Sequence, residues 1–178
     1  MKDIRRVVTG HDERGSALFS DDATVAPIEL ALVPGLQSFE LWSTKAAPSI
    51  PDATGGPGAP SYFPGSGGTV FRVVTFPPDA EATFAPDFDL AAALEEAQAK
   101  VPDLVAKLEP EDPGMHTTDS VDYAIVIEGE LDCELDEGRT VRVSAGDCLV
   151  QRGTRHAWRN RGDHPARVAF ILLGGTRD

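Results

Sequence analysis

The chain has little cysteine, few basic residues and no long apolar run. Its two cysteines, Cys133 and Cys148, form no Cys-x-x-Cys pair, which excludes a zinc ribbon or a dithiol redox motif. Both lie in alternating apolar stretches, so two reduced core thiols in a cytoplasmic protein are expected. No stretch approaches the roughly 18 apolar residues of a membrane-spanning helix. The opening MKDIRRVVTG lacks the apolar segment of a signal peptide, so no membrane partner is expected.

The charge balance and the missing motifs exclude several function classes. Lys and Arg number 16 against 29 Asp and Glu, a net charge of −13, which repels nucleic-acid phosphates, so no nucleic-acid partner is expected. The chain has no P-loop, no Gly-x-Gly-x-x-Gly after a strand and no Gly-x-Ser-x-Gly. With 178 residues, 41% of them apolar, the composition is that of one globular domain spanning 1–178.

Most of the chain has the two-residue period of β-strands. Residues 1–44 contain three strand-like runs that we expect to join the main sheet or a partner subunit. Residues 45–68 hold five prolines and six glycines, which predicts a long loop. Residues 69–178 begin with a clear strand and end in seven short runs, starting with HTTDS, that are separated by Gly and Asp turns. This spacing predicts an all-β, antiparallel sandwich or barrel.

One segment, 87–108, departs from this pattern because its apolar residues recur every three or four positions. They are Leu90, Leu94, Ala97, Val101, Leu104, Val105 and Leu108. The spacing predicts a helix, with Asp87 or Asp89 as its N-cap and a favourable Glu96–Lys100 pair. Pro102 predicts a kink or two short helices. The segment either packs against one face of the barrel or covers its mouth.

Several side chains in the β-rich part could bind a metal, and they stand at alternate positions that would point to the same face of a strand. If HTTDSVD is extended, His116, Thr118 and Asp122 share one face. On a later hairpin, His156 shares a face with Trp158. Imidazole and carboxylate groups together suit a divalent transition metal, with positions left open for substrate, water or O₂.

The stretch from His116 to Asn160 resembles the cupin superfamily. Its first motif has Gly, His-x-His, Glu and Gly at fixed spacing; His116 fits the first His, Thr118 stands at the second, Asp122 stands at the Glu, and Gly129 follows six residues later. The second motif is matched at Gly146, Gly153, His156 and Asn160. The opening RRVVTGHDERG is also similar to that of many small single-domain cupins.

The resemblance implies a jelly-roll β-barrel that holds Fe, Ni, Mn or Zn. It implies His116, Asp122 and His156 as the metal ligands, with Asp122 or a bound water moving protons. The Thr118 hydroxyl is a poor replacement for an imidazole, and Asp122 is one carbon shorter than the family's Glu. Either the backbone moves inward, a water completes the shell, or no tight site remains. Cupins often pair by exchanging N-terminal strands, which implies a homodimer.

Four side chains are candidates for substrate binding. Arg72 lies in the middle of a strand, where it either clamps a substrate carboxylate or is a surface arginine. Thr118 is a candidate pocket wall, and Gln151 could offer its amide oxygen, although its direction is open. Trp158 lines the pocket or packs the core.

The resulting expectation is a metal-dependent enzyme that acts on a small organic molecule inside the barrel, by oxidative, decarboxylating or isomerising chemistry. The alternative is a non-catalytic cupin that binds a small ligand, with weak metal binding or none. A structural or storage role is the third interpretation; it leaves the two histidines and the aspartate without a purpose.

Overall fold

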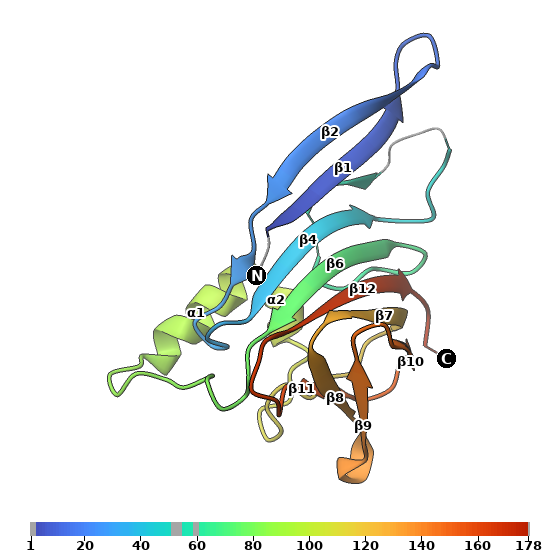
Figure 1. The fold of residues 1–178 in the computed structure, drawn as a ribbon. Helices are drawn as coiled ribbons and strands as arrows, with labels where there is room; N and C mark the ends of the chain where they lie inside the picture. The colour runs from blue at the N-terminus through green and yellow to red at the C-terminus, as the bar shows by residue number, and fades with distance from the viewer. Residues whose placement is uncertain (1–2, 51–54, 59–60, 178) are drawn as a thin grey trace.

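The computed structural model describes residues 3–50, 55–58 and 61–177, and Figure 1 shows their fold. The strands, in chain order, are β1 (Ile4–His11), β2 (Ala17–Val25), β3 (Ile28–Glu29), β4 (Gln37–Thr44), β5 (Gly55–Gly56), β6 (Thr69–Phe76), β7 (Ser120–Glu128), β8 (Glu130–Glu134), β9 (Thr140–Ser144), β10 (Cys148–Arg152), β11 (Ala157–Arg159) and β12 (Ala166–Gly174). A single 3₁₀ turn, Asp136–Gly138, joins β8 to β9.

The strands form two facing sheets and one separate hairpin. The larger sheet has the order β10-β7-β12-β6-β4-β3, with β5 paired to β4, and the smaller has the order β11-β8-β9. All pairings are antiparallel, which confirms the expected all-β jelly-roll class. Of the three N-terminal runs, the one that forms β4 joins the larger sheet, and the two-residue strand β3 pairs with it. In contrast, β1 and β2 pair only with each other, and their turn extends away from the body (Figure 1).

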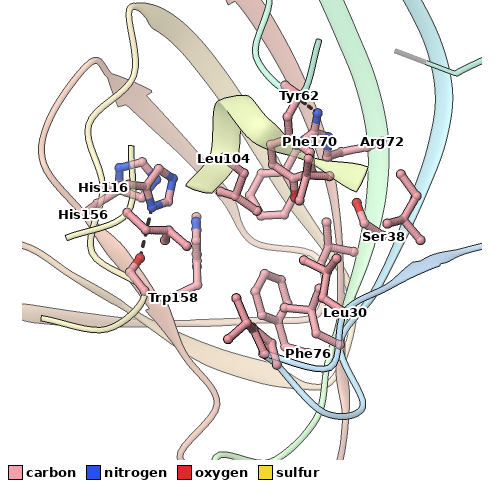
Figure 2. A pocket seen from close by; sticks show the side chains of 18 of the residues that line it. Leu30, Ser38, Tyr62, Arg72, Phe76, Leu104, His116, His156, Trp158 and Phe170 are labelled. Atoms are coloured by element: carbon pink, nitrogen blue, oxygen red, sulfur yellow. Dashed lines mark hydrogen bonds between the residues drawn. The ribbon is translucent and has the colours of Figure 1, made fainter. Parts of the chain in front are cut away.

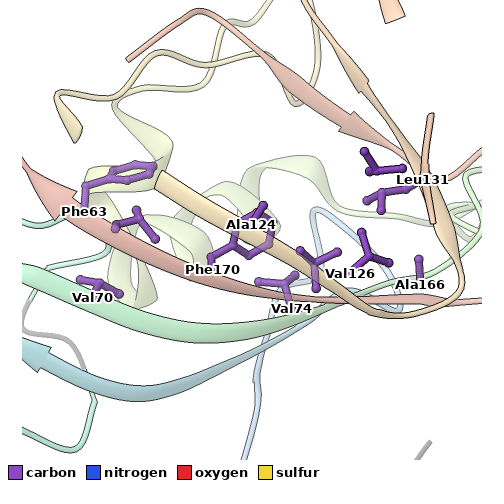
Figure 3. Close-up of a cluster of buried hydrophobic side chains, with 11 residues drawn as sticks. Phe63, Val70, Val74, Ala124, Val126, Leu131, Ala166 and Phe170 are labelled. Carbon is purple, nitrogen blue, oxygen red and sulfur yellow. The ribbon is translucent and has the colours of Figure 1, made fainter. Parts of the chain in front are cut away.

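The main core lies between the two sheets (Figure 3). Val74 of β6, Val126 of β7 and Val168 of β12 project from the larger sheet, and Leu131 of β8 and Val143 of β9 project from the smaller one. Full burial of one such side chain contributes about 1.5–3 kcal/mol. Gly129 makes the tight turn from β7 to β8 with φ 74°, and a Cβ there would lie 2.8 Å from the Pro165 carbonyl oxygen, so only glycine fits.

Strand β7 carries apolar residues on both faces. Its inward residues, including Ala124 and Val126, are buried, whereas Val121, Tyr123 and Ile125 point outward and are exposed. A strand with one face in water normally alternates apolar and polar residues. This outer face is therefore unusual for a strand exposed to water. Cys133 is buried as expected, but Cys148 is exposed, because it lies opposite Ile125 on the same outer face.

The helical segment divides as its proline predicts. Helix α1 spans Leu90–Lys100 and helix α2 spans Pro102–Val105, with Pro102 at the first position of α2. Asp89 is the N-cap of α1 and accepts a hydrogen bond from the Ala92 amide. Glu96 and Lys100 form the expected ion pair at 2.6 Å. None of the helices in the described part of the chain is long and apolar enough to cross a membrane.

Two local predictions need correction. The segment HTTDS is not a strand: His116 makes an isolated bridge to His156, and β7 begins only at Ser120. The Thr118 carbonyl accepts a hydrogen bond from the Arg177 side chain instead of from the backbone of a neighbouring strand. The 45–68 loop contains the short strand β5; its residues 51–54 and 59–60 lie outside the described residues.

Candidate functional site

A cavity of about 380 Å³ lies beside the core and is walled mostly by apolar side chains (Figure 2). Leu30, Phe76, Leu104 and Phe170 contribute to this wall, from four separate parts of the chain. Its polar groups gather at two places: His116 and His156 lie beside Trp158, and Arg72 lies beside Tyr62 and Ser38. The arrangement suits an apolar molecule that carries a polar group.

The two histidines are joined through their backbones. The His116 amide donates to the His156 carbonyl at 3.0 Å, and the His156 amide donates to the His116 carbonyl at 2.9 Å. The ring centroids lie 4.4 Å apart. Each Nδ1 lies within hydrogen-bond distance of the carbonyl two residues earlier, at Gly114 (3.0 Å) and Thr154 (2.9 Å). If both Nδ1 atoms carry the proton, both Nε2 atoms are left as acceptors.

Burial keeps both imidazoles neutral near pH 7. Burial, together with the neighbouring His156, lowers the pKa of His116 from 6.5 to about 4. Burial also lowers the pKa of His156, while its bond to the Thr154 carbonyl acts in the opposite direction. Two neutral, oriented rings can accept a proton or a hydrogen bond from a bound molecule.

Asp122 lies in the same cavity, on the inner face of β7. Burial raises its pKa, whereas the hydroxyls of Ser120 and Thr118 and the charges of His116 and Arg72 lower it. Its Oδ1 atom is buried and has no hydrogen-bond partner among the described residues. A carboxyl group with an unsatisfied oxygen is suited to contact a ligand or an ordered water.

The predicted metal ligands His116, Asp122 and His156 do not form a three-ligand set. Within residues 3–50, 55–58 and 61–177, no three His, Cys, Asp or Glu side chains converge closely enough to hold a metal ion. His116 and His156 are adjacent, but Asp122 does not complete a three-ligand set with them in this arrangement. The present donor set therefore does not fit the expected 2-His-1-carboxylate centre, and metal binding by these residues stays a prediction.

Arg72 lines the cavity and is paired. Its Nε lies 3.2 Å from Glu40 Oε1, and both side chains are buried. Its guanidinium stacks 3.6 Å from the centre of the Tyr62 ring and donates to the Tyr62 carbonyl. Ser38 donates to the same Glu40 oxygen at 2.8 Å. Arg72 therefore faces the cavity, but as half of an ion pair.

The other three candidates for substrate binding lie in different positions. Trp158 lines the cavity and packs edge-on against His156 and Phe170. Gln151 lines it too, but its amide oxygen accepts a bond from Thr154 and its nitrogen lies 3.7 Å from Cys133 Sγ. Thr118 is buried beside Asp122 and is not among the residues that line the cavity.

Several residues in or beside the cavity wall could not be recognised from the sequence. Tyr62 and Phe63 come from the Pro/Gly-rich loop, and their aromatic character within it was the available signal. Glu40 lies opposite Arg72 on β4, which only the strand register reveals. Leu104 shows that α2 contributes to the cavity wall.

The family comparison agrees with the motif pattern. The family model "Cupin domain" matches residues 104–172, the segment that holds both histidines, Asp122 and Gln151. Phomopsin biosynthesis cluster protein C' of Diaporthe leptostromiformis is 49% identical over 61 residues, which are 33% of this chain and 32% of that protein. Cupin-domain-containing oxidoreductase virC of Hypocrea virens is 44% identical over 62 residues, again 33% and 32%. The chain thus matches about a third of the length of these relatives.

Among solved structures, a putative ethanolamine utilization protein from Salmonella typhimurium aligns over 99% of this chain and all of that one, with a TM-score of 0.47 and 11% identity. Similarity at this level says nothing about function. The family match and the paired cupin motifs at 116–129 and 146–160 show the cupin family for residues 104–172 of the chain.

Proposed function

We propose that the chain is an enzyme that binds a small organic molecule with a mostly apolar body and acts on a polar group of that molecule beside His116, His156 and Asp122. The single observation that carries this proposal is the cavity of about 380 Å³, apolar over most of its wall, in which these three side chains lie. A catalytic pocket combines such an apolar wall with a few convergent polar groups whose pKa values are shifted.

The reaction class is proposed from chemistry and from relatives. A neutral imidazole can accept a proton from a substrate hydroxyl or an activated C–H, and the neighbouring carboxyl can exchange a proton with the substrate or with water. Four of the relatives are named cupin-domain-containing oxidoreductases, which favours oxidation of the substrate. Dependence on Fe, Ni, Mn or Zn would need a further ligand beside His116 and His156, and no step is assigned to a metal.

The test is conversion of substrates by the protein purified without a His-tag. The chain is incubated with a panel of phenols, ketones and aldehydes, in air and under nitrogen, with and without added Fe²⁺, and products are identified by mass spectrometry. We expect conversion of at least one compound by the wild type and a loss of at least a hundredfold in His156→Ala. Binding without conversion under every condition would refute catalysis.

One observation favours a second candidate, a non-catalytic cupin that binds a small ligand. In the described part of the chain no three metal-capable side chains converge, and the cavity wall is mostly apolar. A ligand that copurifies with the chain and is recovered unchanged from it would favour this function over catalysis.

The expected homodimer is proposed to form through the outer face of the larger sheet. This outer face is formed by Phe71, Val121, Tyr123, Ile125, Ile127, Val150 and Leu173, all exposed. Ile4 and Val25 of the β1–β2 hairpin cover the adjoining cluster around Phe39 and Val73 within the same chain. An exposed apolar face of this extent marks an interaction site, and a second copy that brings its own apolar face and hairpin suits it.

A further inference from the structure

Two cationic side chains, Arg72 and Arg159, lie in the described wall of the cavity apart from the histidines. Arginine is the residue that most often clamps a substrate carboxylate, because its planar group matches the two oxygens. Whether either arginine is free to do so decides which charge the cavity accepts.

Arg72 is held inside the protein by Glu40. The two residues are directly opposite on strands β6 and β4, and their exposed fractions are 3% and 8%. Arg72 Nε lies 3.2 Å from Glu40 Oε1, and Ser38 fixes that oxygen with a bond of 2.8 Å. Tyr62 covers the guanidinium with its ring and takes one N–H with its carbonyl. The positive charge of Arg72 is thus balanced before any ligand enters.

Arg159 is balanced as well. It lies 2.8 Å from a Glu134 oxygen and 3.1 Å from an Asp112 oxygen, and it also donates to the Pro113 carbonyl. The wall further contains the carboxyl groups of Asp79 and Asp122. A carboxylate entering this cavity would lose its hydration and find no unpaired arginine in return.

We propose that Glu40 is a specificity-determining residue, which occupies Arg72 and thereby makes the cavity select uncharged, mainly apolar molecules over the corresponding carboxylates. This inference rests on the proposed function, because it requires the cavity to be a site for small molecules. Arg72 then does not clamp a substrate carboxylate, as the sequence had suggested, because Glu40 already neutralises its charge.

The charge change at position 40 tests the proposal with little change in shape. Glu40→Gln keeps the side-chain length and an oxygen for Ser38, but removes the negative charge, so that the Arg72 guanidinium becomes available to the cavity. The double variant Glu40→Gln/Arg72→Gln removes both charges. Glu130→Gln is the matched control, because it makes the same substitution at an exposed carboxylate that is not among the residues lining the cavity.

The probes are naphthalene-2-carboxamide and naphthalene-2-carboxylate, which have the same shape and differ in charge. Their dissociation constants are measured at pH 7.5 by ligand fluorescence, and folding is checked by circular dichroism. For wild type and Glu130→Gln we expect the amide to bind at least tenfold more tightly than the carboxylate. In Glu40→Gln this preference falls at least tenfold, and in the double variant it returns.

Each outcome is decisive. Equal binding of the two probes by the wild type refutes the selectivity and leaves the proposed function standing; this comparison needs no variant and so remains available if Glu40→Gln does not fold. An unchanged preference in folded Glu40→Gln refutes the role of Glu40. Failure of both probes to bind the wild type and every folded variant refutes the cavity as a site for such molecules, and the proposed function with it.

Discussion

His116 and His156 lie 40 residues apart in the sequence but form a reciprocal pair of backbone hydrogen bonds, at 3.0 and 2.9 Å, with their rings 4.4 Å apart. Each ring nitrogen Nδ1 lies within hydrogen-bond distance of the carbonyl two residues before it. Neither histidine lies within a strand, so the site depends on this bridge between two loops. The backbone pairing, more than strand parity, sets the direction of both rings.

Metal binding is the first prediction, because the geometry supplies two adjacent imidazoles. Two ligands hold a divalent ion less tightly than three. We expect the protein purified without a His-tag to retain well under one metal per chain after dialysis, by elemental analysis. Zinc taken up on addition should be lost in both His116→Ala and His156→Ala, with the fold intact by circular dichroism. A stoichiometric metal in the dialysed wild type, or full uptake by either variant, would contradict this expectation.

Stability should fall on mild acidification. His116 has a folded pKa of about 4, while the unfolded chain titrates near 6.5. Between these values the unfolded chain takes up a proton that the folded chain does not. The contribution of His116 to the free energy of unfolding is therefore complete above pH 6.5 and decreases as the pH falls towards 4. The lowered pKa of His156 acts in the same direction. Urea unfolding at pH 7, 5.5 and 4.5, with EDTA present, measures this loss.

A His116→Gln variant provides the control for this pH dependence. It should lose less stability than the wild type over the same interval, because one titrating group is removed. Asp122 acts oppositely: its folded pKa is raised, so its contribution is present at low pH and is lost as the pH rises through that pKa. Identical pH dependence in the wild type and His116→Gln would show that His116 is not the titrating group.

The core between the sheets should tolerate little change. Leu131 is 2% exposed and packs against the main cluster. Leu131→Ala should lower the free energy of unfolding by about 2–5 kcal/mol, because it removes buried apolar volume and leaves a cavity. Leu94→Ala, on an exposed position of α1, should change it by under about 1 kcal/mol. Urea denaturation of the two variants compares them, and equal effects would refute this account of the core.

The outer face should control assembly. Sedimentation of the wild type should give twice the chain mass of 18.9 kDa. Tyr123→Lys places a charge in the middle of the outer face, where the side chain is 44% exposed, and should give a folded monomer. Val141→Lys, at a position that is 53% exposed but lies on β9 of the other sheet, should leave the dimer intact. A monomeric wild type, or a dimeric Tyr123→Lys variant, would refute this interface.

The sequence alone determined the all-β antiparallel class, the divided helix at Pro102 and the cupin motifs within residues 104–172, because these depend on local periodicity, turn residues and the fixed spacing of the motifs. It also named His116, Asp122 and His156 as candidate site residues, and all three line one cavity.

Only the tertiary structure decided how these groups meet. The alternation of residues along a strand could not place His116, because His116 lies before β7 begins. Nor could it show that Glu40 neutralises Arg72, which lies 32 residues later in the sequence but opposite Glu40 in the sheet. It also could not place Cys148 on an exposed face, since Cys148, Leu149 and Val150 of β10 are all apolar and offer no contrast between inside and outside. The physical reason is the same in each case: charge pairing and burial depend on which strands become neighbours, and that is a property of the whole fold.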